Sequence, residues 1–595
     1  MNFHRGVWTL SVLLGWLGAN HAVAQTSTQP GGELRALHVD ASQPGIRSVA
    51  EVTQLVQTTR AAHFNALWIE IRKNGETYWR SNVEPHAPWS DDSYDPLSEV
   101  LRQAHDTNSG PRLEVHGWID LLPVWDQRTV TPPSALHVFR QHPEWVTRHQ
   151  NGTNFGRAYL LDPGHPGVSD YLATVVTELA AKYELDGLVL GGLQYPDDEI
   201  SGSRKGWGFN SVALQRFQHL QHRATIPDPA DPLWDQFRRD QLTTLARRLA
   251  FEAMTVRPGL KLAAVGIAYP NGDYPISWEN TSTYREIFQD WRGWVREGWL
   301  DTVVPLLDFD ARRNRRDWEG WSTFVKENRS GRQVIFGLKT SNNNLSAILS
   351  LAHSVRRSSE HALGADGLVL RSYSTPTTDH SPGELFASLV KPSSSETNLV
   401  PLFQESVTVP NMPWKTRPTR ARLWVRCPDG TDGSDAARVD LRGAMTRTLT
   451  ADANGWIGSA DLLPGEYLLS VRPFGTQKIR AVGTFTARAG MTAQPRLLPA
   501  DEDADRDGMS NLDELTVGTD PLNPESKLAV DVTVLADRLQ LQVRPVRPGR
   551  QYHLEAADHS IGPWQSVSDT ASLDGSEASV ELPGATRHFR VRVEY

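Results

Sequence analysis

The sequence predicts an α/β protein: a (β/α)₈ TIM-like barrel followed by two small all-β domains. Short aliphatic segments alternate with longer amphipathic ones from residue 33 to residue 390. This alternation predicts a parallel sheet covered by helices, and the short segments number eight, which is the number that closes a barrel. After residue 390 the segments are short, alternate in polarity and are separated by glycine turns, as in β-domains. A doubly wound open sheet is the main alternative for the first part of the chain.

The predicted barrel strands share β-branched and aliphatic residues. They are Leu34–Val39, Ala66–Ile71, Leu113–Trp118, Asp186–Leu190, Lys261–Ile267, Thr302–Leu307, Gln333–Leu338 and Asp366–Arg371. The predicted helices have apolar residues at helical spacing. They are Val49–Ala62, Val168–Tyr183, Leu233–Val256, Tyr284–Glu297 and Leu345–His361.

Composition changes along the rest of the chain. Residues 391–419 are rich in Pro, Ser and Thr and are predicted to be a linker. Residues 420–499 predict a β-sandwich, and residues 527–595 a C-terminal all-β domain. The turn and strand around residues 454–467 resemble the carboxypeptidase-regulatory-like or prealbumin-like modules. The predicted sandwich strands are Ala421–Arg426, Val439–Arg442, Thr446–Thr450, Gly465–Val471 and Ile479–Ala487.

Bulk composition is that of a soluble multi-domain protein. The 595 residues are too many for one hydrophobic core, and 39% hydrophobic with 22% charged residues is ordinary for folded proteins. A net charge of −9 without a dense Lys/Arg block argues against nucleic acid as a partner. The single cysteine, Cys427, excludes an intrachain disulfide.

The N-terminal residues predict export. His4 and Arg5 precede the apolar run Val7–Leu17, and an Ala-Val-Ala phrase ends at Ala24. This order is typical of a secretory signal peptide over residues 1–24. The run is too short to cross a bilayer, and no later stretch is long and apolar enough. We therefore expect a secreted, periplasmic or cell-surface protein without a stable membrane span.

An acidic loop at residues 500–526 predicts a structural calcium site. Alternating carboxylates on a tight loop supply the oxygen ligands that Ca²⁺ requires, and Gly508 permits the sharp turn. The loop resembles thrombospondin type 3 repeats, which adds Asp520 as an implied ligand. A solvated acidic linker is the alternative. The predicted ligands are Asp503, Asp505, Asp507, the Met509 carbonyl, Asn511 and Glu514.

The barrel resembles the glycosyl hydrolase-like 10 family over roughly residues 33–376. The resemblance rests on short phrases that occur in the family's order along the chain. They are Ala66–Arg72 with Gly75–Tyr78 and Glu84-Pro85, Tyr94–Leu97, His105, Leu113–Trp118, His142–Trp145, Leu160–Gly164, Asp186–Leu190, Tyr195-Pro196 and Gly298–Pro305. The resemblance implies hydrolysis of glycosidic bonds in a polysaccharide, peptidoglycan being one known substrate, and no cofactor for the barrel.

The sequence departs from the family after the fourth barrel strand. Family members typically carry an acidic pair there, whereas this chain has Gly191 and Gly192. Glycosidases usually need two carboxyl groups, one as acid and one as base or nucleophile. Other acids follow strands, where the loops of a barrel form the active site. The candidate catalytic residues are Asp40, Asp120, Asp308 and Asp310.

Further side chains near strand ends are candidates for binding substrate, each with a structural alternative. Arg72 could bind a sugar oxygen or form a structural ion pair, and His116 could donate to a hydroxyl or belong to the core. Asp162 could bind substrate or cap a turn. Aromatic rings could stack on pyranoses. The predicted set is Arg72, His116, Trp118, Trp125, Asp162 and Tyr195. Glu70 is expected either at the mouth or paired inside the barrel.

Two functions therefore remain open from the sequence. The first is an exported glycoside hydrolase that uses a relocated carboxylate pair. The second is a non-catalytic carbohydrate-binding or scaffold protein that has lost the family's acids at Gly191 and Gly192. The arrangement of carboxyl groups at the barrel mouth distinguishes them.

Overall fold

The fold was analysed in a computed structural model of the chain. It describes residues 32–594 apart from 88, 90–92, 201–203, 309–313, 342, 359–361, 393–399, 429–433, 535, 537, 547–549, 569–571, 575–576 and 584–587. The predicted signal peptide, residues 1–24, and the candidate Asp310 lie outside these described residues. No helix within the described ranges is long and apolar enough to cross a bilayer.

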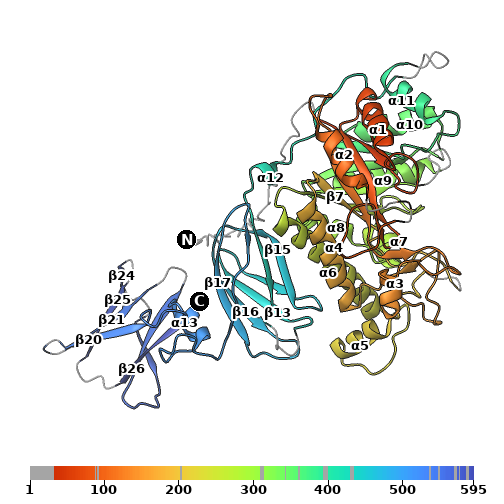
Figure 1. The fold of residues 1–595 in the computed structure, drawn as a ribbon. Coiled ribbons are helices and arrows are strands. Elements are labelled where there is room, and N and C mark those ends of the chain that lie inside the picture. Colours follow the sequence, from red (N-terminus) through yellow and green to blue (C-terminus); the bar gives the residue numbers. More distant parts are fainter. Residues whose placement is uncertain are drawn as a thin grey trace, which may run out of the picture.

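Eight parallel strands close into a ring, which confirms the predicted TIM-like barrel (Figure 1). The first strand pairs with the second, Ala36 opposite Ala66, and also with the last, Leu34 opposite Gly367, so the sheet has no open edge. The open-sheet alternative is therefore excluded. The barrel strands are β1 (Leu34–Val39), β2 (Ala66–Lys73), β4 (Glu114–Asp120), β7 (Gly187–Gly191), β8 (Lys261–Ile267), β9 (Thr302–Leu306), β10 (Gln333–Lys339) and β11 (Gly367–Arg371).

Helices surround the barrel strands, and most begin where polar caps predict. Ser48, for example, accepts a hydrogen bond from the backbone N–H of Glu51 at the start of α1. The single helix predicted over Tyr284–Glu297 is wrong, because the chain breaks there at Phe288, which has a φ of 57°. The helices are α1 (Val49–Ala61), α2 (Pro96–His105), α3 (Val138–Gln141), α4 (Pro166–Lys182), α5 (Ser211–Leu220), α6 (Pro232–Val256), α7 (Ser282–Arg285), α8 (Trp291–Arg296), α9 (Arg315–Glu327), α10 (Leu345–Arg356) and α11 (Pro382–Val390).

The inside of the barrel is filled by side chains. Alternate residues of each strand point inward, as the period of two requires. The inner layer is apolar apart from a few polar groups, among them His38, His116 and Glu70. The barrel is therefore a packed core with its functional surface at one end. Its inward apolar residues include Leu34, Ala36, Ala66, Trp68, Trp118, Val189, Val265, Val304, Ile335 and Val369.

The segment predicted to be a linker packs against the barrel where it is described. Leu402 and Phe403 are buried, and the Phe403 ring meets the ring of Phe64 edge-on at 5.1 Å. The backbone N–H of Glu33 donates to the carbonyl of Thr408. A short helix, α12 (Pro413–Thr416), follows. The Pro-, Ser- and Thr-rich composition suggested a free linker, but buried apolar residues attach this segment to the barrel.

Two small sheets follow, and their strands are mostly antiparallel, as expected for a β-domain. One sheet has the order β15-β12-β18 and the other β14-β13-β16-β17-β19. The sequence missed β15, the strand next to the barrel. Their strands are β12 (Ala421–Arg426), β13 (Arg438–Gly443), β14 (Arg447–Thr450), β15 (Trp456–Leu462), β16 (Gly465–Arg472), β17 (Ala481–Ala487), β18 (Thr492–Ala493) and β19 (Leu498–Pro499).

These sheets, which we call the sandwich, share a core with the barrel. The Trp424 ring stacks on Phe251 of α6 at 5.1 Å and on Trp456 at 4.7 Å. The Arg248 guanidinium lies over the Trp456 ring, and Arg216 pairs with Asp435 at 2.8 Å. The sandwich is therefore bound to the barrel by an apolar and ionic interface.

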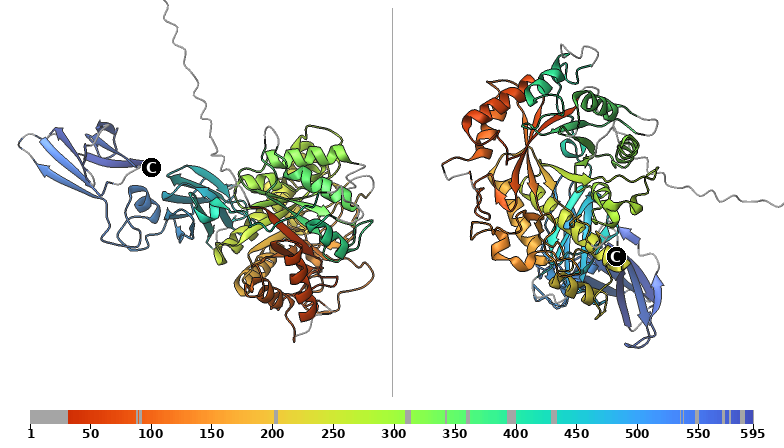
Figure 2. Two further views of the ribbon diagram at one scale, coloured as in Figure 1. Left: turned by 90° about the horizontal axis from the view of Figure 1, so that it is seen from above. Right: turned by 90° about the vertical axis from the view of Figure 1, so that its right-hand side faces the viewer.

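The last part of the chain adds one helix and two further sheets. Figures 1 and 2 show the sandwich between the barrel and this C-terminal part. The sheets have the orders β20-β21-β25-β24 and β23-β22-β26, with antiparallel pairing throughout. The elements are α13 (Asn511–Val517), β20 (Ala529–Val534), β21 (Arg538–Arg544), β22 (Gln551–Ala557), β23 (Gln565–Ser568), β24 (Ser572–Asp574), β25 (Glu577–Pro583) and β26 (His588–Glu594).

Candidate functional site

Three carboxyl groups and one ammonium group meet at the C-terminal ends of the first three barrel strands. Asp40 follows β1, Glu70 and Lys73 lie at the end of β2, and Asp120 ends β4. The Lys73 Nζ lies 3.1 Å from Asp40 Oδ1 and 3.0 Å from Glu70 Oε2. We call these four residues the mouth cluster. They occupy the end of the barrel at which TIM-barrel enzymes carry their active sites.

Asp40 and Glu70, which we call the dyad, hydrogen-bond to each other, and their pKa values are shifted in opposite directions. Burial, together with the charges of Asp120 and Asp40, raises the pKa of Glu70 well above its ordinary value, and Lys73 offsets only part of this. Burial alone would also raise the pKa of Asp40. Hydrogen bonds from Glu70 and Ser42 and the charge of Lys73 outweigh burial and hold it well below its usual range. The surroundings therefore favour the protonated form of Glu70 and the ionised form of Asp40.

Asp120 is held beside the dyad by an indole group. The Trp118 Nε1–H donates to Asp120 Oδ1 at 3.0 Å. A side-chain carbon at Gly191 would lie 2.5 Å from that carboxyl oxygen and 2.7 Å from the indole nitrogen. At Gly192 it would lie 2.6 Å from Pro123. Atoms of neighbouring residues therefore fill the space of both glycines, and neither could be replaced by an acid without displacing a neighbour.

Asp308 and Arg371 form an ion pair at the same end of the barrel. Both carboxyl oxygens of Asp308 accept from Arg371 Nη1, at 2.9 and 3.0 Å. The Arg371 guanidinium also lies 5.7 Å from the centre of the Trp118 ring. The candidate Asp308 is thus at the mouth as predicted, but it is paired with an arginine and separate from the dyad.

Arg72 does not reach the mouth surface. Its side chain is fully buried and forms two hydrogen bonds with Glu84, at 2.6 and 2.7 Å. Tyr171 also donates to Glu84, and Arg72 donates to the Asp120 carbonyl. The structural ion pair, one of the two alternatives from the sequence, is what the structure contains, and the substrate-binding prediction for Arg72 is corrected.

Three more predicted binding residues are buried. His116 lies inside the barrel, where it contacts Glu114 at 3.0 Å and stacks on Trp68. Trp125, at the end of β5 (Pro123–Trp125), donates to the Val130 carbonyl at 2.6 Å. Trp118 is only 5% exposed, so its ring orients Asp120 but presents no open face for a sugar. Alternation along β4 predicted that His116 and Trp118 lie on the inner face, but it could not show how deeply they are buried.

Asp162 and Tyr195 are likewise covered. Asp162 is 0% exposed and accepts from the backbone N–H of Gly164 at 2.8 Å, the turn-capping alternative. Burial raises its pKa to about 6. Tyr195 is 1% exposed and packs edge-on against Phe288. Among the described residues, packing therefore covers both side chains.

Glu70 is the functional candidate that the sequence left undecided. It faces inward with Trp68, and Lys73 follows three residues later, so a carboxyl and an ammonium group at one strand end were the available signal. That signal could not distinguish the mouth from the core. The distinction depends on how far Glu70 lies along the barrel axis, and this is set by the pairing of β2 with β4.

Comparison with known proteins now gives the family. The family model described as "Glycosyl hydrolase-like 10" matches residues 5–337, more than half of the chain. The chain belongs to this family. The matched range contains the dyad, Asp120 and the two glycines at the end of β7, Gly191 and Gly192.

Two curated relatives are named as glycosyl hydrolases. "Glycosyl hydrolase DigH" of Escherichia coli (strain K12) is 23% identical over 323 residues, 49% of this chain and 67% of that protein. "Glycosyl hydrolase YngK" of Bacillus subtilis (strain 168) is 23% identical over 298 residues, 46% of this chain and 53% of that protein. The matches cover about half of this chain.

Solved structures resemble the chain only distantly. The catalytic domain of β-amylase from Paenibacillus polymyxa covers 59% of this chain and 96% of its own, with 13% identity and a TM-score of 0.41. A β-galactosidase from Marinomonas ef1 covers 62% of this chain and 56% of its own, with 11% identity and a TM-score of 0.39. At these scores the likeness adds nothing to the family assignment.

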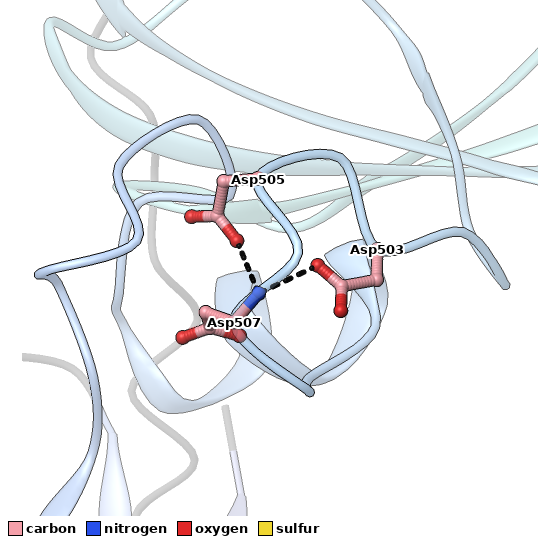
Figure 3. Close-up of side chains that lie close together, drawn as sticks. All are labelled: Asp503, Asp505 and Asp507. Atoms are coloured by element: carbon pink, nitrogen blue, oxygen red, sulfur yellow. Dashed lines mark hydrogen bonds between the residues drawn. The ribbon is translucent and has the colours of Figure 1, made fainter.

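The acidic loop gathers three carboxylates before α13. Carboxylate oxygens of Asp503, Asp505 and Asp507 lie within 4.8 Å of one another (Figure 3). Asp503 accepts from the backbone N–H groups of Arg506 and Gly508, at 2.6 and 2.9 Å, which folds the loop around its side chain. The backbone N–H of Met509 donates to Asp507 at 2.9 Å. The loop therefore brings the three aspartate carboxylates close together.

Glu514 adds a buried carboxyl to this loop. It is 0% exposed, and its Oε2 has no hydrogen-bond partner among the described residues, as is also true of Asp505 Oδ2 and Asp507 Oδ2. Burial and the charges of Asp505 and Asp507 raise its pKa to about 7. Asn511 does not share this property: its amide accepts from Ala504 at 3.2 Å and donates to the Pro499 carbonyl at 2.7 Å. These bonds hold the loop, and the role of Asn511 as a calcium ligand stays a prediction.

Proposed function

We propose that the protein hydrolyses glycosidic bonds in a polysaccharide at the barrel mouth. The observation that carries this proposal is the dyad at the end of the barrel where this fold carries active sites: Lys73 contacts both Asp40 and Glu70, and the two surroundings lower the pKa of Asp40 and raise that of Glu70. Environments that push the pKa values of two carboxyl groups apart are how one site supplies acid and base at the same pH. The family assignment of residues 5–337 supports the same chemistry.

The dyad suits the base or nucleophile side of the reaction. The ionised Asp40 oxygen faces solvent more than Glu70 does, with 26% against 9% side-chain exposure. Lys73 holds both carboxyl groups in place. Asp40 and Glu70 hydrogen-bond to each other, so they are too close together to bracket a glycosidic bond, for which retaining enzymes leave about 5–5.5 Å. The proton donor for the leaving group must therefore come from another side of the mouth.

Reducing-end release from a panel of polysaccharides tests the proposal. We expect Asp40→Asn to reduce release by ~10²–10⁴-fold, because it removes the group that accepts the proton. Glu70→Gln should reduce release less, because Glu70 holds Asp40 in position through their hydrogen bond. Asp106→Asn is the matched control, since Asp106 also accepts from a nearby backbone N–H and a serine hydroxyl, but follows α2 at the other end of the barrel. Full activity in both dyad variants would contradict the proposal.

A non-catalytic glycan-binding barrel is the second candidate. It is favoured by Gly191 and Gly192, whose side-chain space is filled by neighbours. The same panel separates the two functions. A wild-type protein that binds a polysaccharide but releases no reducing ends from it would identify the binding role.

We also propose that the acidic loop binds Ca²⁺ as a structural ion. Support comes from the convergence of three aspartates and from the buried, unpartnered Glu514 oxygen, which a hard cation would satisfy. Asp503, Asp505, Asp507 and Glu514 would supply carboxylate oxygens, and the Met509 carbonyl would add a backbone oxygen. Export of the protein, inferred from the signal peptide over residues 1–24, is consistent with such a site.

Calorimetry with and without Ca²⁺ tests this site. At a concentration 100 times the dissociation constant, bound Ca²⁺ should stabilise the surrounding fold by about 2.7 kcal/mol and raise its melting temperature. Glu514→Gln should abolish most of this increase, whereas Glu525→Gln, a change at an exposed position of the neighbouring turn, should not. Equal stabilisation by Ca²⁺ in wild type and Glu514→Gln would rule out Glu514 as a ligand.

A further inference from the structure

A hairpin places a second glutamate beside the mouth cluster. β2 continues through the turn Asn74-Gly75 into the two-residue strand β3 (Glu76–Thr77). Both turn residues have positive φ, 55° and 70°, as in a type I′ turn. Lys73 is directly opposite Glu76, and opposed residues of an antiparallel pair project from the same face. Glu76 is therefore presented on the face from which Lys73 reaches the dyad.

Glu76 does not form an ion pair with Lys73, although Lys73 lies opposite it in the hairpin. Lys73 turns to Asp40 and Glu70, and within the described part of the chain no hydrogen bond or ion pair reaches the Glu76 carboxyl. The residue is only 7% exposed. A buried, uncompensated carboxylate is costly, so such a group tends to keep its proton.

Tyr78 follows β3 and is influenced by both Glu70 and Glu76. Burial, followed by the charges of Glu70 and Glu76, raises the pKa of Tyr78 to about 12. Both glutamates therefore lie within electrostatic reach of one hydroxyl. Glu70 approaches from β2 and Glu76 from β3, with Lys73 between them in the hairpin.

We propose that Glu76 is the carboxylic acid that protonates the departing glycosidic oxygen, across the mouth from the dyad. This role rests on the proposed glycoside hydrolysis. The Glu76 proton moves to the glycosidic oxygen as the bond from the anomeric carbon breaks and leaves its electron pair on that oxygen. A water oxygen then bonds to the anomeric carbon, and its proton passes to the Asp40 carboxylate. One water is consumed, and solvent returns the two carboxyl groups to their starting states.

The charged groups around Glu76 predict how its proton responds to pH. Lys73 faces it from β2, Tyr78 follows it on its own strand, and Asp126 follows β5 (Pro123–Trp125). His137 packs beneath the turn, where its Nε2 contacts the Asn74 carbonyl at 2.8 Å. Burial, and then the charge of Asp126, raises the pKa of Glu76 to about 7. Activity should therefore be lost as pH rises through about 7 and Glu76 loses its proton.

Two substrates of different leaving-group ability test Glu76. The probes are the methyl and 2,4-dinitrophenyl glycosides of the sugar that the wild-type protein releases from the polysaccharide panel. Glu76→Gln should reduce hydrolysis of the methyl glycoside by ~10²–10⁴-fold, the contribution of an acid catalyst. Hydrolysis of the dinitrophenyl glycoside should fall less than about tenfold, since that leaving group needs no proton. Glu76→Asp should restore part of the lost rate.

A second variant changes the pKa without touching the acid. Asp126 is exposed, and Asp126→Asn removes the charge that raises the pKa of Glu76, so the alkaline limb of the pH profile should move to lower pH. An unmoved limb, or Glu76→Gln hydrolysing the methyl glycoside at the wild-type rate, would overturn the assignment of Glu76 alone. A wild-type protein inactive on every substrate would instead overturn the hydrolase proposal on which it rests.

Discussion

Arg72→Met is expected to lower the free energy of unfolding of the barrel by about 3–5 kcal/mol. The substitution leaves the Glu84 carboxylate fully buried without its cation, next to the Tyr171 hydroxyl. It also removes the donors to the carbonyls of Asp120 and Leu121, which fix the end of β4. Urea unfolding of the full chain, followed in the barrel transition, measures the loss.

The double variant with Glu84→Leu and a surface control complete this test. Replacing both buried charges by apolar side chains should recover much of the lost stability, because no isolated charge remains. Arg102→Met should change stability by at most about 0.5 kcal/mol, since Arg102 pairs with Glu99 on the surface, where its side chain is 64% exposed. If Arg72→Met kept full stability but lost glycan binding, Arg72 would be a substrate ligand after all.

Trp424→Ala is expected to lower the free energy of unfolding of the barrel and sandwich together by about 3–5 kcal/mol. Trp424 is 1% exposed and belongs to the same buried cluster as the barrel helices. Its removal leaves a cavity between Phe251 and Trp456, whose rings it separates by parallel stacking at 8° and 12°. Differential scanning calorimetry should show one transition for barrel and sandwich in the wild type, and a lower one in the variant.

Trp564→Ala is the matched control for this change. Trp564 is half-buried in the C-terminal domain, where Arg590 lies over its ring at 4.5 Å. Its removal should lower the melting temperature of the C-terminal transition only. This decrease should be smaller than the decrease that Trp424→Ala causes in the transition of the barrel and sandwich. A barrel transition that does not move in Trp424→Ala would show that the barrel is stable without the sandwich.

The Arg72→Met result would also show how the mouth cluster is held in position. Arg72 bonds to the backbone of Asp120, so the buried ion pair supports the position of the mouth cluster although it touches no substrate. Arg72 should therefore behave as a positioning residue. The dyad and Glu76 are the groups whose loss should change the chemistry itself.

Strand prediction succeeded in the barrel for a physical reason. Barrel strands are buried on both faces, so segments such as Lys261–Ile267 are continuous apolar runs that local sequence identifies. Prediction of secondary structure failed where a contact with a residue distant in sequence determines the local conformation. β15 contains Gly458, and glycine does not favour a strand. Glycine is needed at this position because a side-chain carbon there would lie 2.7 Å from the Phe251 ring of α6. The break at Phe288 in the predicted helix Tyr284–Glu297 likewise has no glycine or proline to announce it.

The candidate site was only partly predictable. The order of strands along the chain placed Asp40 and Asp120 at one end of the barrel, because parallel strands bring their C-terminal ends together. It did not reveal that Glu70 joins Asp40. The Asn74-Gly75 turn was a readable hairpin signal, and with it the sequence could have placed Glu76 opposite Lys73.

Residue order and periodicity by themselves predicted the eight barrel strands, most of the β-strands that follow them and the spacing of the acidic loop, since each depends on neighbours within a few positions. Closure of the barrel depends on the pairing of β1 with β11, which are distant in sequence. The tertiary structure alone decided which charges are paired and which are left over. Arg72 pairs with Glu84, Lys73 pairs with Asp40 and Glu70, and Glu76 has no ion-pair partner among the residues that the structure describes. Pairing depends on where distant segments bury each group, and burial is what turns an ordinary carboxyl into an acid that holds its proton near neutral pH.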